Sequence, residues 1–314
     1  MNFVKSRSFI FSFFIILIIT LSSVYFFGKT EEKLKTVKCF YRPFTIHGFF
    51  SEYLNFLGCK IWCRENNYEL YIDENLKDNI GGFDTYFVPF DIKKIKFKEN
   101  WIGKTRLSEC KNKWVLSGDF YEKRHECNFK GKLGKVRREQ YRKEIEKTYI
   151  FNEKFRQEVN EEIKKYATLI NEGFVGFHVR RGDKITEVNG GFSSLETYMD
   201  RFKNIEKTKE NKIKNIFVVS DDPAIVDSFK EKFPSYDFFS RPSTNKSYDQ
   251  LEFNALSTDK KRVYIKNFLI DLEIIKASKY AIVATSSNVG AFIMLSMYPN
   301  CYTIDSENDE LFLA

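Results

Sequence analysis

The sequence predicts an α/β protein whose second half is built around a parallel sheet. From residue 174 onward, short β-branched and aromatic runs alternate with amphipathic stretches of helical period. Strict succession of strand and helix is typical of parallel strands joined by right-handed crossovers. The length of 314 residues allows two domains, and the hydrophobic content of 43% indicates packed cores rather than disorder.

The elements of this half follow one another in a regular order. We predict strands at 174–179, 216–219, 236–239, 280–284 and 301–304. We predict helices at 195–202 with its continuation, 223–233, 263–277 and 288–297. The carboxyl ends of parallel strands meet at one edge, and open α/β sheets bind their ligands there.

The first half carries weaker signals. We predict a helix within 47–63, a strand at 68–72 and a second strand at 85–88, with a glycine turn between the strands. A charged stretch at 136–170 indicates one or two helices, and 110–133 is typical of loops. We therefore place an N-terminal α/β domain at 39–170 and a C-terminal domain at 171–314.

An apolar segment precedes both domains. Residues 9–27 contain no charged side chain and are long enough to span a bilayer as a helix. Lys5 and Arg7 stand before it, so the positive-inside rule leaves 1–8 in the cytoplasm and the body in the lumen. Residues 28–38 would form a short stem. A cleaved signal peptide is the alternative, but its apolar core is normally shorter. We predict an uncleaved anchor of the secretory pathway.

The cysteines and the net charge indicate the compartment of the protein and the kind of partner that it binds. Five of the six cysteines precede residue 130, so disulfides in an oxidising compartment would concentrate in the first half. The alternative zinc site matches no standard spacing. It would use Cys59, Cys63, Cys110, His125 and Cys127. The triplet Asn245-Lys246-Ser247 matches the consensus for N-glycosylation.

The net charge of +8 favours anionic partners in general. The chain has no compact basic arm of the kind that would indicate binding to nucleic acid.

The most informative segment is FVGFHVRRGDK at 174–184, where a buried strand ends in a cluster of charge. If the strand persists, Arg180 and Arg181 point to opposite faces, so that one of them reaches into a cleft. A guanidinium at a strand end suits a pyrophosphate, because its planar fork bonds two oxygens. A surface ion-pair cluster with Asp183 is the alternative.

Two more strand-to-helix junctions should reach the same edge. Ser286 and Ser287 open a helix, where free amides and the dipole attract phosphate, although plain N-capping explains a serine as well. Asp221 and Asp222 follow the strand at 216–219. Two carboxylates could bind a metal ion, as in the Asp-x-Asp glycosyltransferases. These two residues are adjacent, however, so their side chains should point in different directions. We prefer a helix cap before Pro223.

Three segments together resemble the motifs of the GT-B fucosyltransferases. They are HVRRGDK, FVVSDDPAIV and FLIDLEIIKASKYAIVATSSNVGAF, in order and with similar spacing over about 173–312. The α-1,6-fucosyltransferases, which include core and nodulation enzymes, are the group that they resemble best. The resemblance implies a GT-B-like fold of two Rossmann-like halves, the first on the acceptor side. It also implies an inverting, metal-independent transfer of fucose from GDP-fucose to a glycan, in the Golgi.

The resemblance implies roles for individual residues in donor binding. Arg180 would contact the β-phosphate, His178 would lie near the guanosine, and Ser287 would bind phosphate. Asp271 would accept two hydrogen bonds from the guanine edge. Asn288 stands where a glutamine is usual. The other candidates for this site are Arg181, Asp221, Asp222 and Ser286.

The resemblance also implies catalytic and acceptor-side residues. Asp183 and Lys184 would shape the catalytic pocket, and Tyr198 matches an acceptor-side tyrosine. Glu187 is the candidate base, although this chain is one residue shorter at that point. An α-1,6 linkage to an N-glycan-type GlcNAc is the expected product. An α-1,2-fucosyltransferase is one alternative. A non-catalytic binding protein with the GDP-sugar fold is another, because Glu187 is displaced and Asn288 departs from the motif.

Overall fold

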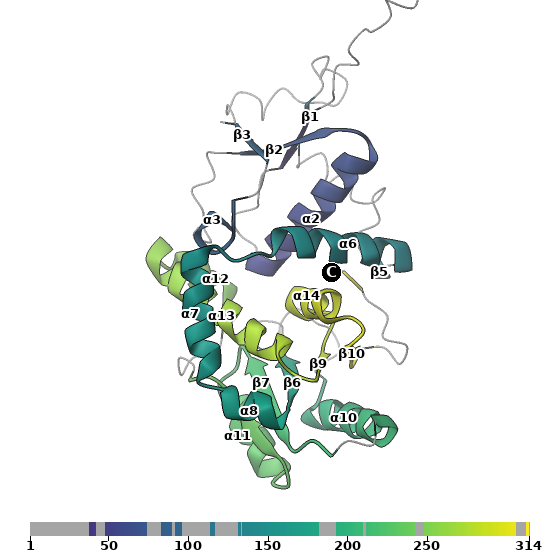
Figure 1. The fold of residues 1–314 in the computed structure, drawn as a ribbon, viewed down its shortest axis with the longest axis vertical. Coiled ribbons are helices and arrows are strands. Elements are labelled where there is room, and N and C mark those ends of the chain that lie inside the picture. Colours follow the sequence, from purple (N-terminus) through teal and green to yellow (C-terminus); the bar gives the residue numbers. More distant parts are fainter. Residues whose placement is uncertain are drawn as a thin grey trace, which may run out of the picture.

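The computed structural model describes eleven stretches of the chain, drawn in colour in Figure 1. They are residues 38–41, 48–73, 83–89, 92–95, 114–116, 131–132, 134–181, 193–209, 212–242, 248–305 and 312–313. The predicted anchor at 9–27 and the sequon at 245–247 lie outside these stretches. Within them, none of the helices has the length and apolar character that crossing a bilayer requires.

The C-terminal half contains a five-stranded sheet in which every neighbouring pair is parallel. Its strands are β6 (Val175–Val179), β7 (Asn215–Ser220), β8 (Asp237–Phe239), β9 (Tyr280–Val283) and β10 (Cys301–Thr303). Their order in the sheet is β10-β9-β6-β7-β8. The chain therefore builds outward from β6 in one direction, and then in the other direction from β9. The carboxyl ends of β6 and β9 mark the point of reversal, where such sheets bind ligands.

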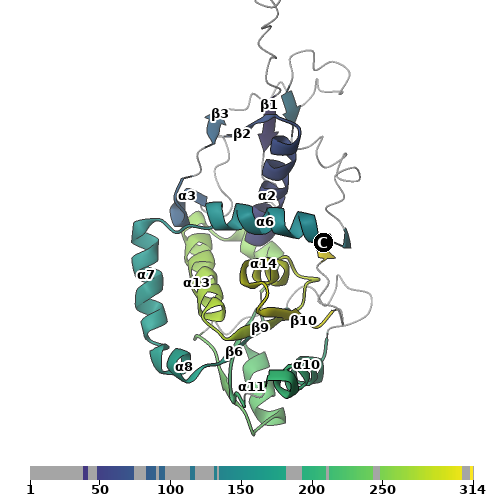
Figure 2. The same cartoon turned by 45° about the vertical axis from the view of Figure 1, so that its right-hand side comes forward.

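Helices cover both faces of this sheet. The helices of this half are α10 (Leu195–Lys209), α11 (Ala224–Lys232), α12 (Gln250–Ala255), α13 (Thr258–Lys276) and α14 (Asn288–Met297). Figures 1 and 2 show α13 and α14 on one side, with α10 and α11 on the other. All five residues of β6 are buried, as expected of a central parallel strand covered on two sides. Every element predicted for this half is confirmed, and α12 is an addition.

The N-terminal half contains a second parallel sheet, in the order β3-β2-β1-β4. Its strands are β1 (Lys38–Tyr41), β2 (Glu69–Asp73), β3 (Lys93–Ile95) and β4 (Trp114–Leu116). The long helix α2 (Phe49–Glu65) connects β1 to β2. A short antiparallel pair joins β5 (Gly131–Lys132) to β11 (Phe312–Leu313), so the C-terminal residues pair with this half.

The linking region contains three helices where one or two were predicted. They are α6 (Lys135–Thr148), α7 (Glu153–Lys164) and α8 (Ala167–Glu172). Asn152 begins α7, because its side chain accepts a hydrogen bond from the Phe155 N–H at 2.9 Å. Gly173 ends α8 with a φ of 84°, a conformation that favours glycine. These two local signals separate the charged stretch into distinct helices.

The predicted strand at 85–88 is wrong. Its first residues belong to a short helix, α3 (Phe83–Tyr86), and Phe87 forms only an isolated antiparallel bridge with Phe151. Asn152 holds this segment, since its backbone N–H donates to the Tyr86 carbonyl at 2.9 Å. Phe87 is buried and stacks on Phe151, with 5.6 Å between the ring centroids. Aromatic burial, and not strand pairing, therefore explains the apolar run.

One hydrophobic cluster runs through both halves. Phe50 of α2 contacts Phe292 of α14 with 4.4 Å between the ring centroids, and Phe268 of α13 at 5.7 Å. Tyr149, which follows α6, contacts Phe292 at 4.8 Å. Figure 2 shows α2 and α6 lying directly over α14 and α13. This shared core places the start of α2 opposite the ligand-binding edge of the C-terminal sheet.

Candidate functional site

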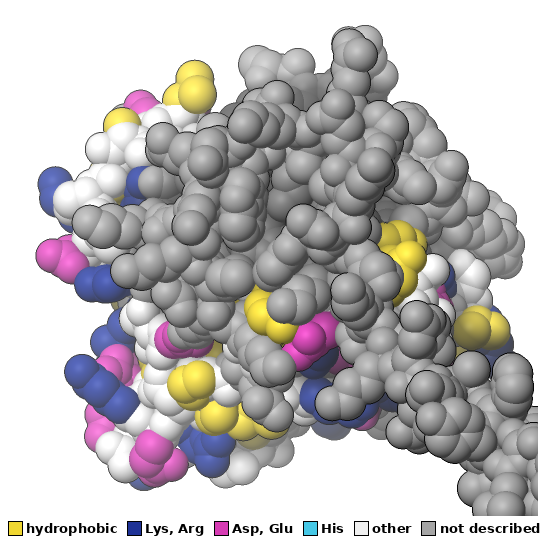
Figure 3. All heavy atoms as spheres, turned by 90° about the horizontal axis from the view of Figure 1, so that it is seen from above, with side chains coloured by type: hydrophobic (Ala, Val, Ile, Leu, Met, Phe, Trp, Pro, Cys, Tyr) yellow, Lys and Arg dark blue, Asp and Glu magenta, His cyan; other side chains and the backbone are white. Residues whose placement is uncertain are grey.

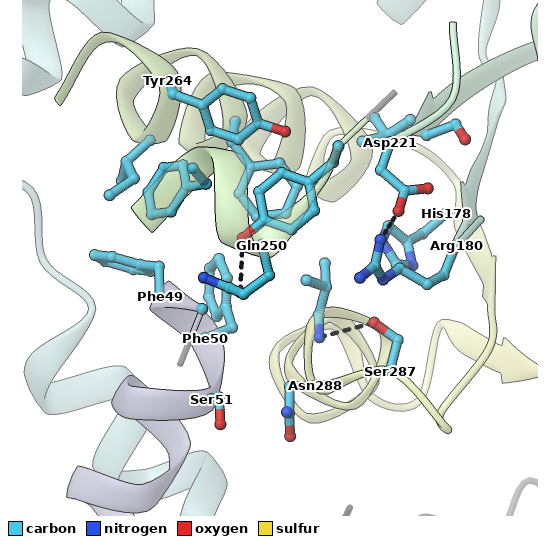
Figure 4. Close-up of a pocket in the computed structure, with 18 residues that line it drawn as sticks. Phe49, Phe50, Ser51, His178, Arg180, Asp221, Gln250, Tyr264, Ser287 and Asn288 are labelled. Atoms are coloured by element: carbon cyan, nitrogen blue, oxygen red, sulfur yellow. Dashed lines mark hydrogen bonds and ion pairs between the residues drawn. The ribbon is translucent and has the colours of Figure 1, made fainter. Parts of the chain in front are cut away.

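A cavity of about 470 Å³ lies between the start of α2 and the ligand-binding edge of the C-terminal sheet (Figure 4). Four parts of the chain line it: the first turn of α2, the ends of β6 and β7, the segment from Tyr248 to Phe268, and the first turn of α14. Its polar residues include His178, Arg180, Asp221 and Ser287. The cavity therefore brings together residues that are far apart in the sequence.

Arg180 supplies the positive charge of the cavity. It is the first residue after β6, and its guanidinium forms an ion pair with the Asp221 carboxylate. The guanidinium carbon also lies 5.5 Å from the centroid of the Tyr248 ring. Figure 4 shows the Arg180 side chain between Asp221 and Ser287, directed into the cavity. A guanidinium in this position can bind two oxygens of a diphosphate.

Asp221 connects three segments that meet at the cavity. Besides pairing with Arg180, its Oδ1 accepts a hydrogen bond from the Arg181 backbone N–H at 2.6 Å. Its own carbonyl accepts from the Tyr248 N–H at 2.8 Å. Asp222 has a different role, because its Oδ1 accepts from the Ala224 N–H at the start of α11, at 3.1 Å. Asp222 thus bonds the first residue of α11, although the N-cap position itself is Pro223, whereas Asp221 belongs to the cavity.

Within the part of the chain that the structure describes, no three His, Cys, Asp or Glu side chains are grouped as ligands. Of the alternative zinc set, Cys110, His125 and Cys127 lie outside the described residues. Cys59 is a buried thiol in α2.

His178 forms part of the cavity wall as a neutral base. It lies in β6 and is 3% exposed. Burial, together with the smaller effect of the nearby Arg180 charge, lowers the pKa of His178 to about 3. The imidazole is therefore neutral at physiological pH. Its buried Nδ1 makes no hydrogen bond to any described residue, so a ligand atom in the cavity can supply the missing partner.

The first turn of α14 presents backbone amides to the same cavity. Ser287 is buried, and its hydroxyl accepts from the Val289 N–H at 3.3 Å. Ser287, Asn288 and Val289 all line the cavity. A helix start carries partial positive charge and suits an anion, and this one faces Arg180. Capping by Ser287 and anion binding at the helix start are therefore compatible.

Gly290 makes this helix start possible. A Cβ at position 290 would lie 1.9 Å from the Ala284 carbonyl oxygen, which is backbone and cannot move aside alone. Only glycine lets α14 pack this closely on the end of β9. We expect Gly290→Ala to lower the free energy of unfolding by about 1–3 kcal/mol, because the helix must shift. Urea denaturation measures this loss, and an unchanged midpoint would contradict the close packing.

The opposite end of the cavity is aromatic. It is lined by Phe49 and Phe50 of α2, Phe253 of α12, and Tyr264 and Phe268 of α13. Figure 4 shows Phe49 and Phe50 across the cavity from Tyr264. Planar apolar walls of this kind suit a ring such as a nucleobase. The cavity therefore has one end for an anionic group and one for a flat ring. That combination matches a nucleoside diphosphate.

Comparison with known proteins agrees with this geometry. Residues 145–299 match the protein family described as alpha-(1,6)-fucosyltransferase N- and catalytic domains. Over this region, which is just under half of the chain, the sequence is similar to the α-(1,6)-fucosyltransferases. The α-(1,6)-fucosyltransferase of Drosophila melanogaster is 26% identical over 133 residues, which are 40% of this chain and 20% of that protein. The match thus spans about a fifth of the relative's length.

Solved fucosyltransferase structures share the fold. NodZ from Bradyrhizobium superposes with a TM-score of 0.52 at 14% identity, over 83% of this chain and 92% of NodZ. A NodZ α-1,6-fucosyltransferase crystal soaked with GDP-fucose gives a TM-score of 0.51 at the same identity and coverage. At this identity the likeness concerns the fold alone. It supports the predicted arrangement of two α/β halves with a parallel sheet in the C-terminal half.

The cavity contains five of the residues singled out in the sequence. They are His178, Arg180, Asp221, Ser287 and Asn288. Arg181 does not line the cavity, which agrees with the expected divergence of the two arginines. Ser286 is exposed, and its N–H donates to Asp305 Oδ2 at 2.8 Å. Asp183, Lys184 and Glu187 lie outside the described residues.

Asp271 and Tyr198 occupy places other than the cavity wall. Asp271 pairs with Arg241, with 3.1 Å between Oδ1 and Nη1. Burial raises the pKa of Asp271 to about 6, while Arg241 lowers it. Tyr198 of α10 is 2% exposed, packs on Phe177, and donates its hydroxyl to the His178 carbonyl at 3.1 Å. As placed here, Tyr198 supports β6 from the core instead of facing an acceptor.

Several cavity residues were not singled out in the sequence. Gly48 and Ser51 open α2, and Tyr248 and Gln250 precede and begin α12. The apolar periodicity within 47–63 is a usable signal for the helix α2, but it does not indicate that the start of this helix lines a cavity. The sequence around Tyr248 and Gln250 has no pattern that predicts a place in the cavity. These residues do not follow a predicted strand, and they do not begin a predicted helix.

Proposed function

We propose that the chain is a GDP-fucose-dependent fucosyltransferase. The observation that carries this proposal is the convergence of Arg180 and the first turn of α14 on one cavity at the sheet's point of reversal. The match of residues 145–299 to the family described as alpha-(1,6)-fucosyltransferase N- and catalytic domains supports it. In this proposal the diphosphate of the donor lies between Arg180 and Ser287, and the guanine lies toward the aromatic end.

The proposed chemistry is an inverting displacement at the fucose carbon that bears the GDP. A base deprotonates the acceptor hydroxyl, that oxygen forms a bond to the sugar carbon, and the bond to the GDP oxygen breaks. Arg180 and the α14 amides stabilise the negative charge that develops on departing GDP. These groups supply positive charge that a divalent metal would otherwise provide, so we propose transfer without a metal. Glu187 remains the candidate base.

The match to the family described as alpha-(1,6)-fucosyltransferase supports a proposal for the linkage. We propose α-1,6 transfer to an N-glycan-type GlcNAc. We also propose that the chain is a type II membrane protein of the Golgi, anchored by residues 9–27 with its catalytic part in the lumen. Cys63, which is disulfide-bonded, supports placement in an oxidising compartment.

The test is a coupled binding and transfer experiment. Purified protein should bind GDP in a calorimetric titration and release GDP from GDP-fucose only when an N-glycan acceptor is present, with EDTA causing no loss. Mass-spectrometric linkage analysis should then find α-1,6-linked fucose. An α-1,2-linked product would instead show that the protein is an α-1,2-fucosyltransferase. GDP binding without turnover on any glycan of a broad panel would instead favour a binding protein.

A further inference from the structure

Tyr248 makes contacts at the point where the two ends of the cavity meet. Its backbone N–H donates to the Asp221 carbonyl at 2.8 Å, and its hydroxyl donates to Gln250 Oε1 at 2.8 Å. Its ring packs against Phe253 and Tyr264, with centroid distances of 5.8 and 5.5 Å. The backbone, ring and hydroxyl of Tyr248 are therefore each held by a different neighbour.

The ring of Tyr248 lies against the Arg180 guanidinium. Its centroid is 5.5 Å from the guanidinium carbon, which is within the range of a cation–π contact. On another side the guanidinium pairs with Asp221. Because the Asp221 carbonyl also anchors Tyr248, the ion pair and the ring contact are parts of one linked unit.

The two contacts differ in what they leave available for a ligand. A carboxylate occupies N–H donors of the guanidinium and competes with phosphate for them. An aromatic ring contacts the π-face of the cation, so the donors in the guanidinium plane stay directed at other acceptors. Arginine carries considerable rotamer entropy, and a preformed contact reduces what is lost on binding. The ring of Tyr248 can therefore hold Arg180 without blocking its donors.

We propose that Tyr248 is a positioning residue that presents the Arg180 guanidinium to the diphosphate of the nucleotide. This inference rests on the proposed function, because it assumes that a nucleoside diphosphate binds in the cavity. Tyr248 acts through Arg180, so its effect depends on the phosphates of the ligand. The hydroxyl bond to Gln250 is secondary, and the ring is the part that matters.

Calorimetric titration of Tyr248→Leu and Tyr248→Phe with GDP and with guanosine tests this inference. We expect Tyr248→Leu to bind GDP about tenfold more weakly, which is the loss of one partly desolvated cation–π contact. Guanosine, which has no phosphate, should bind both variants and the wild type equally. Tyr248→Phe keeps the ring and should stay within about twofold of the wild type.

Two matched comparisons separate positioning from general damage. Phe233→Leu removes another half-buried ring with a cation nearby, since Lys203 Nζ lies 5.7 Å from the Phe233 centroid, but Phe233 does not line the cavity. This variant should bind GDP like the wild type. In an Arg180→Gln background, Tyr248→Leu should cause no further loss of GDP affinity, because the residue through which it acts is missing.

The outcomes distinguish this inference from the function on which it rests. Equal loss of guanosine and GDP affinity in Tyr248→Leu would overturn the inference, since the ring would then contact the base itself. An undiminished effect in the Arg180→Gln background would also overturn it. If the wild type binds GDP and Tyr248→Leu binds it equally well, only the inference fails. A wild type that does not bind GDP refutes the proposed function, and the inference with it.

Discussion

Replacement of Arg180 with alanine is expected to reduce fucosyl transfer at least about 30-fold. Truncating one member of a buried charge pair typically costs ~2–5 kcal/mol, and each ~1.4 kcal/mol corresponds to a tenfold change in rate. Two effects add here, because the variant loses the contact to the departing diphosphate and leaves Asp221 without its cation. The negative Asp221 carboxylate would then repel the phosphates. Steady-state release of GDP from GDP-fucose measures the loss.

Arg181→Ala is the matched comparison for this experiment. Arg181 is adjacent in the sequence, but its side chain does not line the cavity, and its contact with Asp221 is made by the backbone N–H. We therefore expect a clearly smaller effect on the transfer rate than for Arg180→Ala. Turnover retained in Arg180→Ala, or an equal loss in the two variants, would refute the role of Arg180.

The variant Phe292→Ala is expected to lower the free energy of unfolding by about 3–5 kcal/mol, the usual cost of removing a buried phenylalanine ring. Phe292 is 0% exposed and contacts Phe50 at 4.4 Å, Tyr149 at 4.8 Å and Tyr53 at 6.0 Å between ring centroids. These partners belong to the first half of the chain. A cavity at this position therefore weakens the contact between the halves as well as the packing of α14.

Urea denaturation with tryptophan fluorescence and circular dichroism measures this effect. Leu251→Ala provides the control, since Leu251 is 79% exposed and its loss should change the free energy by less than about 0.5 kcal/mol. If Phe292→Ala lost less than about 1 kcal/mol, the cluster at this position would not contribute as a close-packed core does.

The second half of the chain was predictable because its contacts are regular. Alternating strands and helices with apolar periodicity specify a parallel sheet, and the helix at Asn288–Met297 has the bounds that the sequence predicts. The position of Arg180 follows from the same reasoning, since a residue directly after a central strand must reach the ligand-binding edge. Here local pattern and global fold agree.

The first half and the far wall of the cavity were less predictable because they depend on long-range contacts. Phe87 lies in an aromatic cluster with Tyr149 and Phe151, and only the folded chain shows that burial replaced strand pairing. Tyr248 is held at the cavity by a hydrogen bond from its backbone N–H to the Asp221 carbonyl. The local sequence does not predict this long-range contact. For Tyr198, the motif position predicted a contact with the acceptor. In the structure its ring packs on Phe177 in the core.

A crystal structure of the protein soaked with GDP tests the central claim most directly. We predict diphosphate oxygens within hydrogen-bonding distance of both the Arg180 guanidinium and the first turn of α14, with the guanine toward the aromatic end of the cavity. A diphosphate bound away from Arg180 and Ser287, or a GDP outside this cavity, would contradict the account.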